Sequence, residues 1–286
     1  MTQPLISVVI PFWNEEKRIA RAIKCIQDQT YTNLEIIIVD DGATDTSRSI
    51  AEEIAKNDPR ITVLSCPINS GARKNWRGYD INSGCVARAY GFSIAKGEWI
   101  TTQDADDSSL LNRIEVQYNL ALRHNATMVC VEWQQPLEKV AGKKLNVDLL
   151  FREKGEDAFL VRPDVITPLS NENLGLLMRL PFHRFIPFPF KWFPYTRTLF
   201  YGKQTMFIGA DNSMLFHRKV IEQGVNFRRR NERQWGVPSG RGSGRDFVMN
   251  VTYTFKNTWT LRLPLYLWDV RTPNPTTPTY ENYLIT

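Results

Sequence analysis

The chain has 286 residues, enough for one large α/β domain or two small ones with a substantial buried core. Hydrophobic residues make up 42% and charged residues 23%, which is ordinary for a globular protein, and no apolar run reaches the roughly 18 residues of a membrane span. Residues 1–140 carry 15 Lys and Arg against 18 Asp and Glu, whereas residues 141–286 carry 21 against 12. The basic second half predicts either a solvated surface or contact with an anionic partner.

The chain begins MTQPLISVVIPFWNEE and enters a strand-like segment without a basic leader or a cleavage site. We therefore expect no export by a standard signal and a cytoplasmic protein. The four cysteines have no CxxC spacing and lie in or near apolar runs, which favours reduced thiols over disulfides or a zinc site. They are Cys25, Cys66, Cys85 and Cys130.

Strand and helix patterns alternate over the first 130 residues. Residues 5–12 form a short apolar run rich in β-branched residues, which predicts a strand. Asn14 then offers an N-cap for a helix over residues 15–29. The alternation continues with strands over 34–42, 61–66, 98–103 and 127–133 and helices over 44–58, 84–96 and 109–125. It predicts an α/β fold with a mainly parallel sheet, right-handed crossovers and helices on both faces.

The pattern becomes irregular after residue 134. Residues 180–201 are too rich in Pro and aromatic residues for a regular helix. We expect them to pack in the core or in an oligomer contact, to line a sugar-binding groove or to dip into a membrane interface. A strand-like stretch over 205–218 is followed by a mobile basic loop over 228–245, and residues 246–268 close the fold.

The carboxyl ends of the predicted strands collect polar and acidic residues. The first strand delivers Pro11, Trp13 and Asn14, the second Asp40 and Asp41, and the fourth Asp104, Asp106 and Asp107. Ligands of an open parallel sheet bind beyond these ends. Carboxylates gathered without His or Cys suit a hard cation such as Mg²⁺ or Mn²⁺, which in turn suits a diphosphate. The sequence therefore predicts a metal and diphosphate site, with Asp40 more typical of a turn former.

Five motifs in this region resemble the family 2 nucleotide-diphospho-sugar glycosyltransferases of GT-A fold. They are PFWNEE (11–16), QTYTNLEIIIVDDGATD (29–45), NDPRITVL (57–64), AKGEWI (95–100) and DADD (104–107). The resemblance covers residues 5 to 135, with the five motifs in the family's order and spacing. An Asp-x-Asp pair alone would be a weak signal, but the ordered set is specific.

The resemblance implies a role for each matching position. The donor-binding positions are Pro11, Trp13, Asn14, Asp41, Arg88, Asp104, Ala105 and Asp211. The segment around Trp13 and Asp41 would hold the base, and Asp104 would lie near the ribose and the sugar. Asp106 would be the direct metal ligand, and Arg88 would lie near the nucleotide or the donor sugar. About a dozen extra residues over 71–83 depart from the family pattern.

An inverting transfer also needs a carboxylate that takes the proton of the acceptor hydroxyl. The family supplies it as Glu-Asp at a helix start in the second half, and the equivalent here is Asp246, with Arg245 in place of the Glu. Asp211 is the second candidate for the base, or a residue that orients the sugar. Asp246 as a simple helix N-cap is the structural alternative.

Together these observations predict a metal-dependent inverting glycosyltransferase. Residues 1–107 would form the nucleotide-sugar-binding half and residues 108–286 the acceptor-binding half of one domain. The expected donor is a nucleotide diphosphate sugar, with uridine inferred from the resemblance alone. The expected acceptor is a saccharide or lipid-linked saccharide in cell-surface polysaccharide synthesis. The basic second half predicts peripheral membrane contact rather than nucleic-acid binding. The alternatives are a nucleotidyltransferase and a non-catalytic basic protein that binds nucleic acid or membrane.

Overall fold

The computed structural model describes residues 3–68, 82, 84–135, 140–191, 193, 195–236, 242–269 and 280–285. Apart from Asn82, the insertion expected at 71–83 lies outside the described residues, and so do residues 237–241 of the predicted basic loop. Within the described ranges, none of the helices is both long enough and apolar enough to span a bilayer. All four cysteines are free thiols.

Four parallel strands form the first half of the central sheet: β1 (Ile6–Phe12), β2 (Leu34–Asp40), β3 (Ile61–Ser65) and β4 (Trp99–Thr102). Their order is β3-β2-β1-β4. Phe12 pairs with Asp40, and Asp40 pairs with Ser65, so β1, β2 and β3 end at one edge. Every residue of β1 is buried, as expected of a strand covered on both faces.

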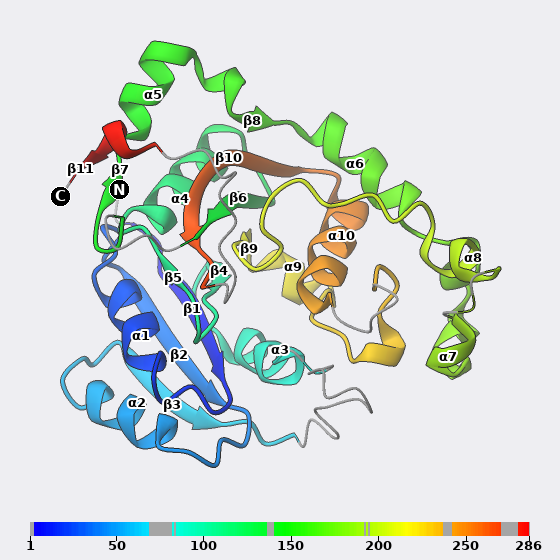
Figure 1. The fold of residues 1–286 in the computed structure, drawn as a ribbon, viewed down its shortest axis with the longest axis horizontal. Helices are drawn as coiled ribbons and strands as arrows, with labels where there is room; N and C mark the ends of the chain where they lie inside the picture. Colours follow the sequence, from blue (N-terminus) through cyan, green and yellow to red (C-terminus); the bar gives the residue numbers. More distant parts are fainter. Residues whose placement is uncertain are drawn as a thin grey trace.

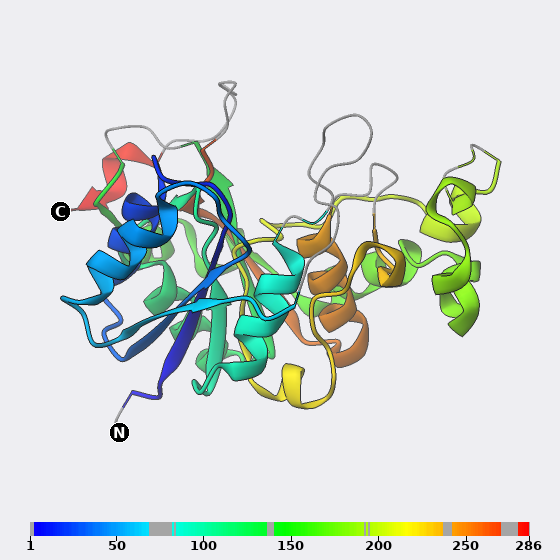
Figure 2. The ribbon, with the colours of Figure 1, turned by 90° about the horizontal axis from the view of Figure 1, so that it is seen from below.

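Helices cover both faces of these strands. Because successive side chains of a strand point to opposite faces, Val8 and Ile10 pack with α1 (Ile19–Gln27) and α2 (Ser47–Ala55), whereas Val9 packs with α3 (Cys85–Ile94). Figures 1 and 2 show α1 and α2 on one side of the sheet and α3 on the other. The α/β architecture predicted for this half is confirmed.

The second half of the chain extends the same sheet. Beyond β4 follow β9 (Leu215–His217), β6 (Met128–Gln134), β10 (Thr258–Leu267) and β5 (Ser108–Ser109), while β8 (Leu160–Val161) pairs with β10. β6 and β10 are parallel, and β9, β5 and β8 are antiparallel to their neighbours. α4 (Arg113–Arg123) lies on the face of α1, and α10 (Ser243–Phe255) lies on the face of α3.

The remaining elements are short. They are the strands β7 (Lys144–Leu145) and β11 (Leu284–Ile285), which pair with each other, and the helices α5 (Val147–Lys154), α6 (Pro163–Glu172), α7 (Phe188–Lys191), α8 (Arg197–Tyr201) and α9 (Lys219–Glu222). Turns of 3₁₀ helix over Leu176–Arg179 and Pro181–Phe185 lead into α7. α7 and α8 lie at the end of the molecule farthest from β3 (Figures 1 and 2).

Three local predictions are wrong. The basic loop expected over 228–245 contains a 3₁₀ turn (Arg230–Glu232) and the buried Trp235, and its last residues belong to α10, which begins at Ser243. Asn14 does not cap α1, which begins at Ile19 after Arg18; Asn14 instead adopts φ +53° and bonds to the loop after β2. The strand expected over 205–218 is limited to β9, because Gly209 adopts φ +112°, outside the extended region. A Cβ at position 209 would also lie 2.8 Å from Cγ2 of Thr260.

Candidate active site

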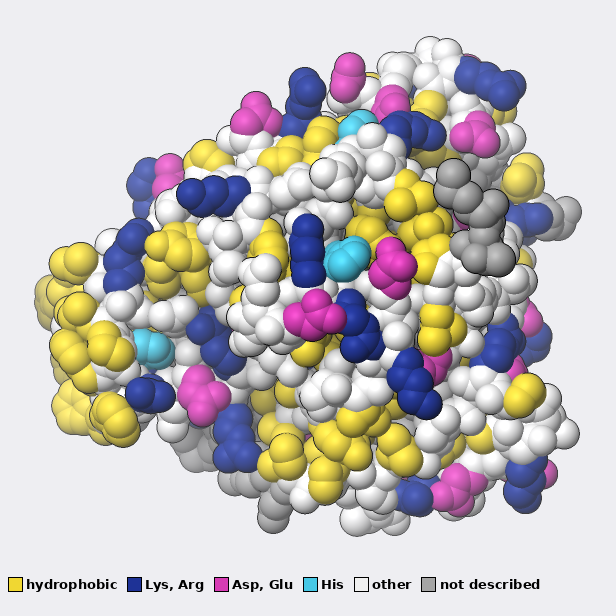
Figure 3. All heavy atoms as spheres, turned by 180° about the vertical axis from the view of Figure 1, so that it is seen from behind, with side chains coloured by type: hydrophobic (Ala, Val, Ile, Leu, Met, Phe, Trp, Pro, Cys, Tyr) yellow, Lys and Arg dark blue, Asp and Glu magenta, His cyan; other side chains and the backbone are white. Residues whose placement is uncertain are grey.

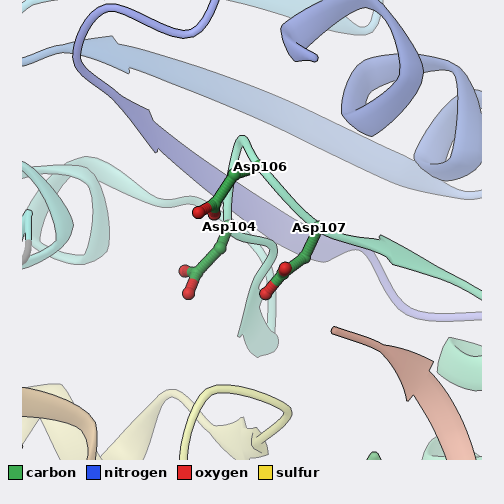
Figure 4. A group of neighbouring side chains, drawn as sticks. All are labelled: Asp104, Asp106 and Asp107. Carbon is green, nitrogen blue, oxygen red and sulfur yellow. The ribbon is translucent and has the colours of Figure 1, made fainter. Parts of the chain in front are cut away.

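Three aspartates leave one tight turn at the end of β4. Carboxylate oxygens of Asp104, Asp106 and Asp107 lie within 4.8 Å of one another (Figure 4). The turn is closed by a hydrogen bond of 3.1 Å from the Asp107 amide to the Asp104 carbonyl. Three oxygen-bearing groups in such a small volume match the ligands that Mg²⁺ and Mn²⁺ prefer.

The charges of this acidic turn destabilise one another. Burial, reinforced by Asp104 and Asp106, raises the pKa of Asp107 to about 8. Burial and the Asp104 charge also raise the pKa of Asp106. Glu15, after β1, has a raised pKa because of its burial and the nearby Asp106. A cation bound among these groups would relieve the repulsion, so the turn fits a divalent metal.

Arg88 and Asn212 hold Asp104 from two other elements. Arg88 of α3 is buried and forms an ion pair with Asp104. Asn212, in the loop before β9, donates its side-chain amide to Oδ2 of Asp104 at 3.2 Å and to Oδ2 of Asp107 at 3.4 Å. Arg88 is thus beside the acidic turn, where it adds positive charge for an anionic ligand.

Contacts from β10 and from the residues after it hold Asp107 in place. The Tyr266 hydroxyl donates to Oδ2 of Asp107 at 2.9 Å and accepts the Asp104 amide at 3.2 Å. The Asp269 amide donates to Oδ1 of Asp107 at 2.9 Å. Beneath Tyr266, the buried Arg113 guanidinium lies 5.7 Å from the ring centroid and bonds to the β4 carbonyl of Thr102 at 3.4 Å. None of these supports was predicted from the sequence.

The ends of β1 and β2 form the neighbouring rim. Asp41 is buried, accepts the Asn82 side-chain amide at 3.1 Å, and donates its own amide to the Phe12 carbonyl at 2.9 Å. Asn14 accepts the Thr44 amide at 2.8 Å, which joins the two strand ends. Asp40 accepts the amides of residues 42 and 43, the turn arrangement expected for it.

The other predicted donor positions differ in exposure. Trp13 is half-buried at the end of β1, whereas Pro11 is buried within β1 and faces Gly84 at the start of α3. The Ala105 side chain is buried in the hydrophobic core, so only its backbone is available to a ligand. Pro11 and Ala105 therefore shape the rim through the backbone or through packing, whereas Asn14 does so through its side-chain hydrogen bond with Thr44.

Asp211 and Asp246 lie around the start of α10. Asp211 is half-buried, and its pKa is raised by burial and by the Asp104 charge, against the opposing effect of Arg245. A Cβ at Gly244, in the first turn of α10, would lie 2.4 Å from the Asp211 carbonyl oxygen. The first turn of α10 thus borders the acidic turn through Asp211.

Asp246 is in the first turn of α10, as predicted, but Gly242 rather than Asp246 is the N-cap. The Asp246 side chain is fully buried. Oδ1 accepts bonds from the Arg228 guanidinium at 2.9 Å and from the amides of Gln234 at 2.8 Å and Trp235 at 2.9 Å. Among the residues that the structure describes, Oδ2 accepts one bond, from Nε of Arg228 at 2.9 Å. In this structure Asp246 anchors residues 228–235 to α10.

The family model described as Glycosyl transferase family 2 matches residues 7–78 and 82–225. The chain belongs to glycosyl transferase family 2. The family 2 match includes the acidic turn, Arg88 and Asp211, but it ends before Asp246 and Tyr266.

Known proteins similar in sequence match about half of this chain. Glycosyltransferase GlyG of Streptococcus pneumoniae is 38% identical over 125 residues, which cover 44% of this chain and 38% of GlyG. The GalNAc(5)-diNAcBac-PP-undecaprenol beta-1,3-glucosyltransferase of Campylobacter jejuni is 30% identical over 149 residues, 51% of this chain and 45% of that enzyme. The chain therefore matches less than half the length of either relative.

A solved structure is similar over nearly the whole fold. The crystal structure of S. aureus TarS 1–349 in complex with UDP-GlcNAc superposes with a TM-score of 0.53 and 15% identity, covering 96% of this chain and 61% of that chain. At this identity the likeness establishes the GT-A-like family 2 fold alone.

Proposed function

We propose that this protein transfers a sugar from a nucleotide diphosphate donor to a hydroxyl of a saccharide or lipid-linked saccharide, in cell-surface polysaccharide synthesis. The observation that carries the proposal is the acidic turn after β4, with three carboxylates within 4.8 Å and a buried Arg88 beside it, in a chain of family 2. The two halves, 1–107 and 108–286, would bind the donor and the acceptor respectively.

Asp106 would be the direct ligand of Mn²⁺ or Mg²⁺, and Asp104 would face the ribose and the sugar. A divalent cation there supplies positive charge against the departing diphosphate. Arg88 contributes a second positive charge that is already in place, because its pair with Asp104 orients it before any ligand arrives. Tyr266 and Asn212 fix the orientation of Asp104 and Asp107, since each contacts both residues.

The nucleotide would lie on the rim formed by Trp13, Asn14 and Asp41. The half-buried Trp13 ring offers a stacking surface, and the Asp41 carboxylate offers an acceptor for base or ribose hydrogen bonds. Uridine is the base we propose, from the family resemblance and from the UDP-GlcNAc complex of TarS.

We propose Asp246 as the proton acceptor and an inverting outcome. Oδ2 accepts a single hydrogen bond among the described residues, so it is the atom with capacity for an acceptor hydroxyl. Because Asp246 is fully buried, Arg228 or its segment has to shift before a hydroxyl can reach it. Asp211 is the competing base: it is half-buried, lies beside Asp104 and needs no such shift.

A donor screen tests the proposal. We expect the full chain to hydrolyse one nucleotide sugar slowly, and to bind the corresponding nucleotide diphosphate by calorimetry, in Mn²⁺ but not in excess EDTA. Equal binding in both conditions would contradict the metal site. Release of pyrophosphate from a nucleoside triphosphate and a sugar phosphate would instead identify a nucleotidyltransferase. Nucleic-acid filter binding serves as a control, expected to be weak and abolished by modest salt.

The peripheral membrane contact expected of the basic second half is a separate proposal. It concerns a different surface, residues 176–206.

A further inference from the structure

Residues 176–206, here called the aromatic lobe, expose an unusual amount of apolar surface. The described part of the chain has fifteen large hydrophobic side chains that are exposed, and nine of them lie in the lobe. They are Leu176, Leu180, Phe182, Phe185, Phe190, Phe193, Tyr195, Leu199 and Met206. Tyr195 is 91% exposed and Phe185 is 77% exposed. Figure 3 shows hydrophobic side chains gathered at the corresponding end of the molecule. Single exposed apolar residues are normal, but such a cluster marks an interaction surface.

The lobe is also basic. Residues 176–206 contain five Lys and Arg and no Asp or Glu. Arg179, Arg184 and Arg197 are exposed among the apolar side chains, and the Arg184 guanidinium lies 5.3 Å from the centroid of the Phe185 ring. Lys203 pairs with Glu172 of α6 at 3.3 Å, so it is partly neutralised.

The inner side of the aromatic lobe is buried and is hydrogen-bonded to the rest of the protein. Met178 is buried, and its carbonyl accepts the Gln234 side-chain amide at 2.9 Å. Lys191 is buried and donates to the Asn231 carbonyl at 3.3 Å, while the Trp235 indole donates to the Ser170 carbonyl at 2.7 Å. The lobe therefore has a buried side and an exposed side, and the exposed rings belong to the folded surface.

Charge decides which partner fits this surface. A second copy of the chain docked lobe to lobe would bring Arg179, Arg184 and Arg197 against the same residues, and like charges oppose such an interface. A bilayer with anionic headgroups accepts both features, because aromatic rings enter the boundary between headgroups and acyl chains while Arg binds phosphate.

We propose that the aromatic lobe docks this protein on a membrane surface rich in anionic lipid. Phe185, Phe193 and Tyr195 enter the interface, and Arg184 and Arg197 bind headgroup phosphates. The anchors of the lobe are in residues 228–235, the segment that Asp246 holds. Docking would therefore bring the α10 side of the site close to the lipid surface. Membrane binding itself requires neither donor nor metal and stands apart from the proposed catalysis.

Vesicle flotation of the full chain, without nucleotide or metal, tests this inference. We expect binding to phosphatidylcholine vesicles that contain phosphatidylglycerol, and roughly tenfold weaker binding to phosphatidylcholine alone. The triple variant Phe185→Ser, Phe193→Ser and Tyr195→Ser should lose about tenfold or more in binding, because it removes inserted apolar area. The pair Arg184→Glu and Arg197→Glu should lose the preference for phosphatidylglycerol.

A matched control changes exposed apolar residues outside the lobe, Leu122→Ser and Val165→Ser, and should bind vesicles as the wild type does. All altered side chains are exposed, so circular dichroism melts should match the wild type. Vesicle binding that is absent, or equal for the lobe and control variants, would overturn the proposal. So would a wild-type dimer in light scattering that the triple variant converts to monomer, which would assign the lobe to self-association.

Discussion

The two sides of the acidic turn are built by different means. On the side of β1 and β2, the groups that face the site directly follow the ends of strands in a regular parallel sheet. On the side of α10 and β10, the groups come from segments more than 100 residues from the turn: Asn212, Tyr266 and Asp269. The side of β1 and β2 is thus built from strand ends, and the other side from long-range packing.

This difference also separates two kinds of constraint. The positions of Trp13, Asn14 and Asp41 are set by backbone turns at the ends of β1 and β2. The opposite side depends on hydrogen bonds that cross the fold, above all that of Tyr266 with Asp107, and on the buried ion pair of Arg228 with Asp246. Substitutions on the first side should alter binding or chemistry alone, whereas those on the second should also change the free energy of unfolding.

The largest effect is expected at the turn itself. Asp106→Asn removes one negative charge at constant size, and we expect kcat for transfer to fall by about 10² to 10³, because charge stabilisation of the departing diphosphate dominates the rate. Steady-state kinetics in Mn²⁺ measure the effect. Asp157→Asn, an exposed carboxylate away from the site, is the control and should change kcat by less than about twofold. Full activity of Asp106→Asn would refute the assigned metal ligand.

The next largest effect on kcat is expected at one of the two carboxylates near α10, Asp246 or Asp211. We expect Asp246→Asn to lower kcat by about 10² to 10⁴, as loss of a general base does, and Asp211→Asn to lower it by less than about tenfold. The reverse order would assign the proton acceptor to Asp211. Both are measured with saturating donor, so that kcat and KM are read separately.

Asp246 also anchors residues 228–235, so a loss of activity caused by lower stability has to be separated from the loss of a proton acceptor. Arg228→Gln breaks the same ion pair but keeps the carboxylate. We expect both Arg228→Gln and Asp246→Asn to be destabilised, by about 3 kcal/mol as for other broken buried pairs. Arg228→Gln should nevertheless retain most of its kcat below its melting temperature. Equal loss of kcat in the two variants would show that Asp246 acts only as an anchor.

A smaller effect, on metal affinity, is expected at Tyr266 of β10, which supports the acidic turn. Tyr266→Phe deletes the hydroxyl that contacts Asp107 and Asp104, and we expect Mn²⁺ affinity to fall by about tenfold, as for other outer residues of metal sites. Calorimetric titration of Mn²⁺ checks this, with Tyr253→Phe on α10 as the control. Unchanged affinity in Tyr266→Phe would show that the turn holds its geometry without β10.

The sequence predicted the first half of the fold well because its signals are local. Continuous apolar runs locate β1, β2 and β4, and the position after a buried strand identifies Asp41 and Asp104 as rim residues. Asn14 is typical of a helix cap by its place before a helical pattern, and no feature of the sequence marks the left-handed backbone, φ +53°, that it adopts.

The second half resists prediction for a physical reason. Tyr266 contacts Asp107 across 159 positions, and nothing in the alternation of β10 marks its hydroxyl as a partner of a distant carboxylate. The aromatic density of residues 180–201 left core, groove and membrane contacts open, and only the side-chain exposures distinguish Phe185 from the buried Met178. The hydrogen-bond partners and the burial of a side chain arise from tertiary packing, which hydrophobic periodicity and secondary-structure propensity do not encode.

The smallest effect is expected in the pH dependence of the free energy of unfolding, and it again involves a residue of the second half. His183 lies on the buried side of the aromatic lobe, where burial, together with Lys191 and Arg228, lowers its pKa to about 4. Asp246 opposes this shift, and Arg184 adds to it. An unfolded His titrates near 6.5, so the unfolded state takes up the proton first as the pH falls. The stability linked to neutral His183 is therefore complete above about pH 6.5 and is lost between that value and about pH 4.

We expect this loss to be on the order of 2 kcal/mol, and His183→Gln to abolish it, because an amide does not titrate in this range. Urea melts at pH 7 and pH 4.5 measure the difference for both proteins, and carboxylates elsewhere contribute equally to each. His217→Gln, a half-buried residue at the end of β9, is the matched control and should keep most of the wild-type slope. If His183→Gln shows the same slope as the wild type, the His183 ring is hydrated in solution, and the packing beneath the lobe is looser than the structure shows.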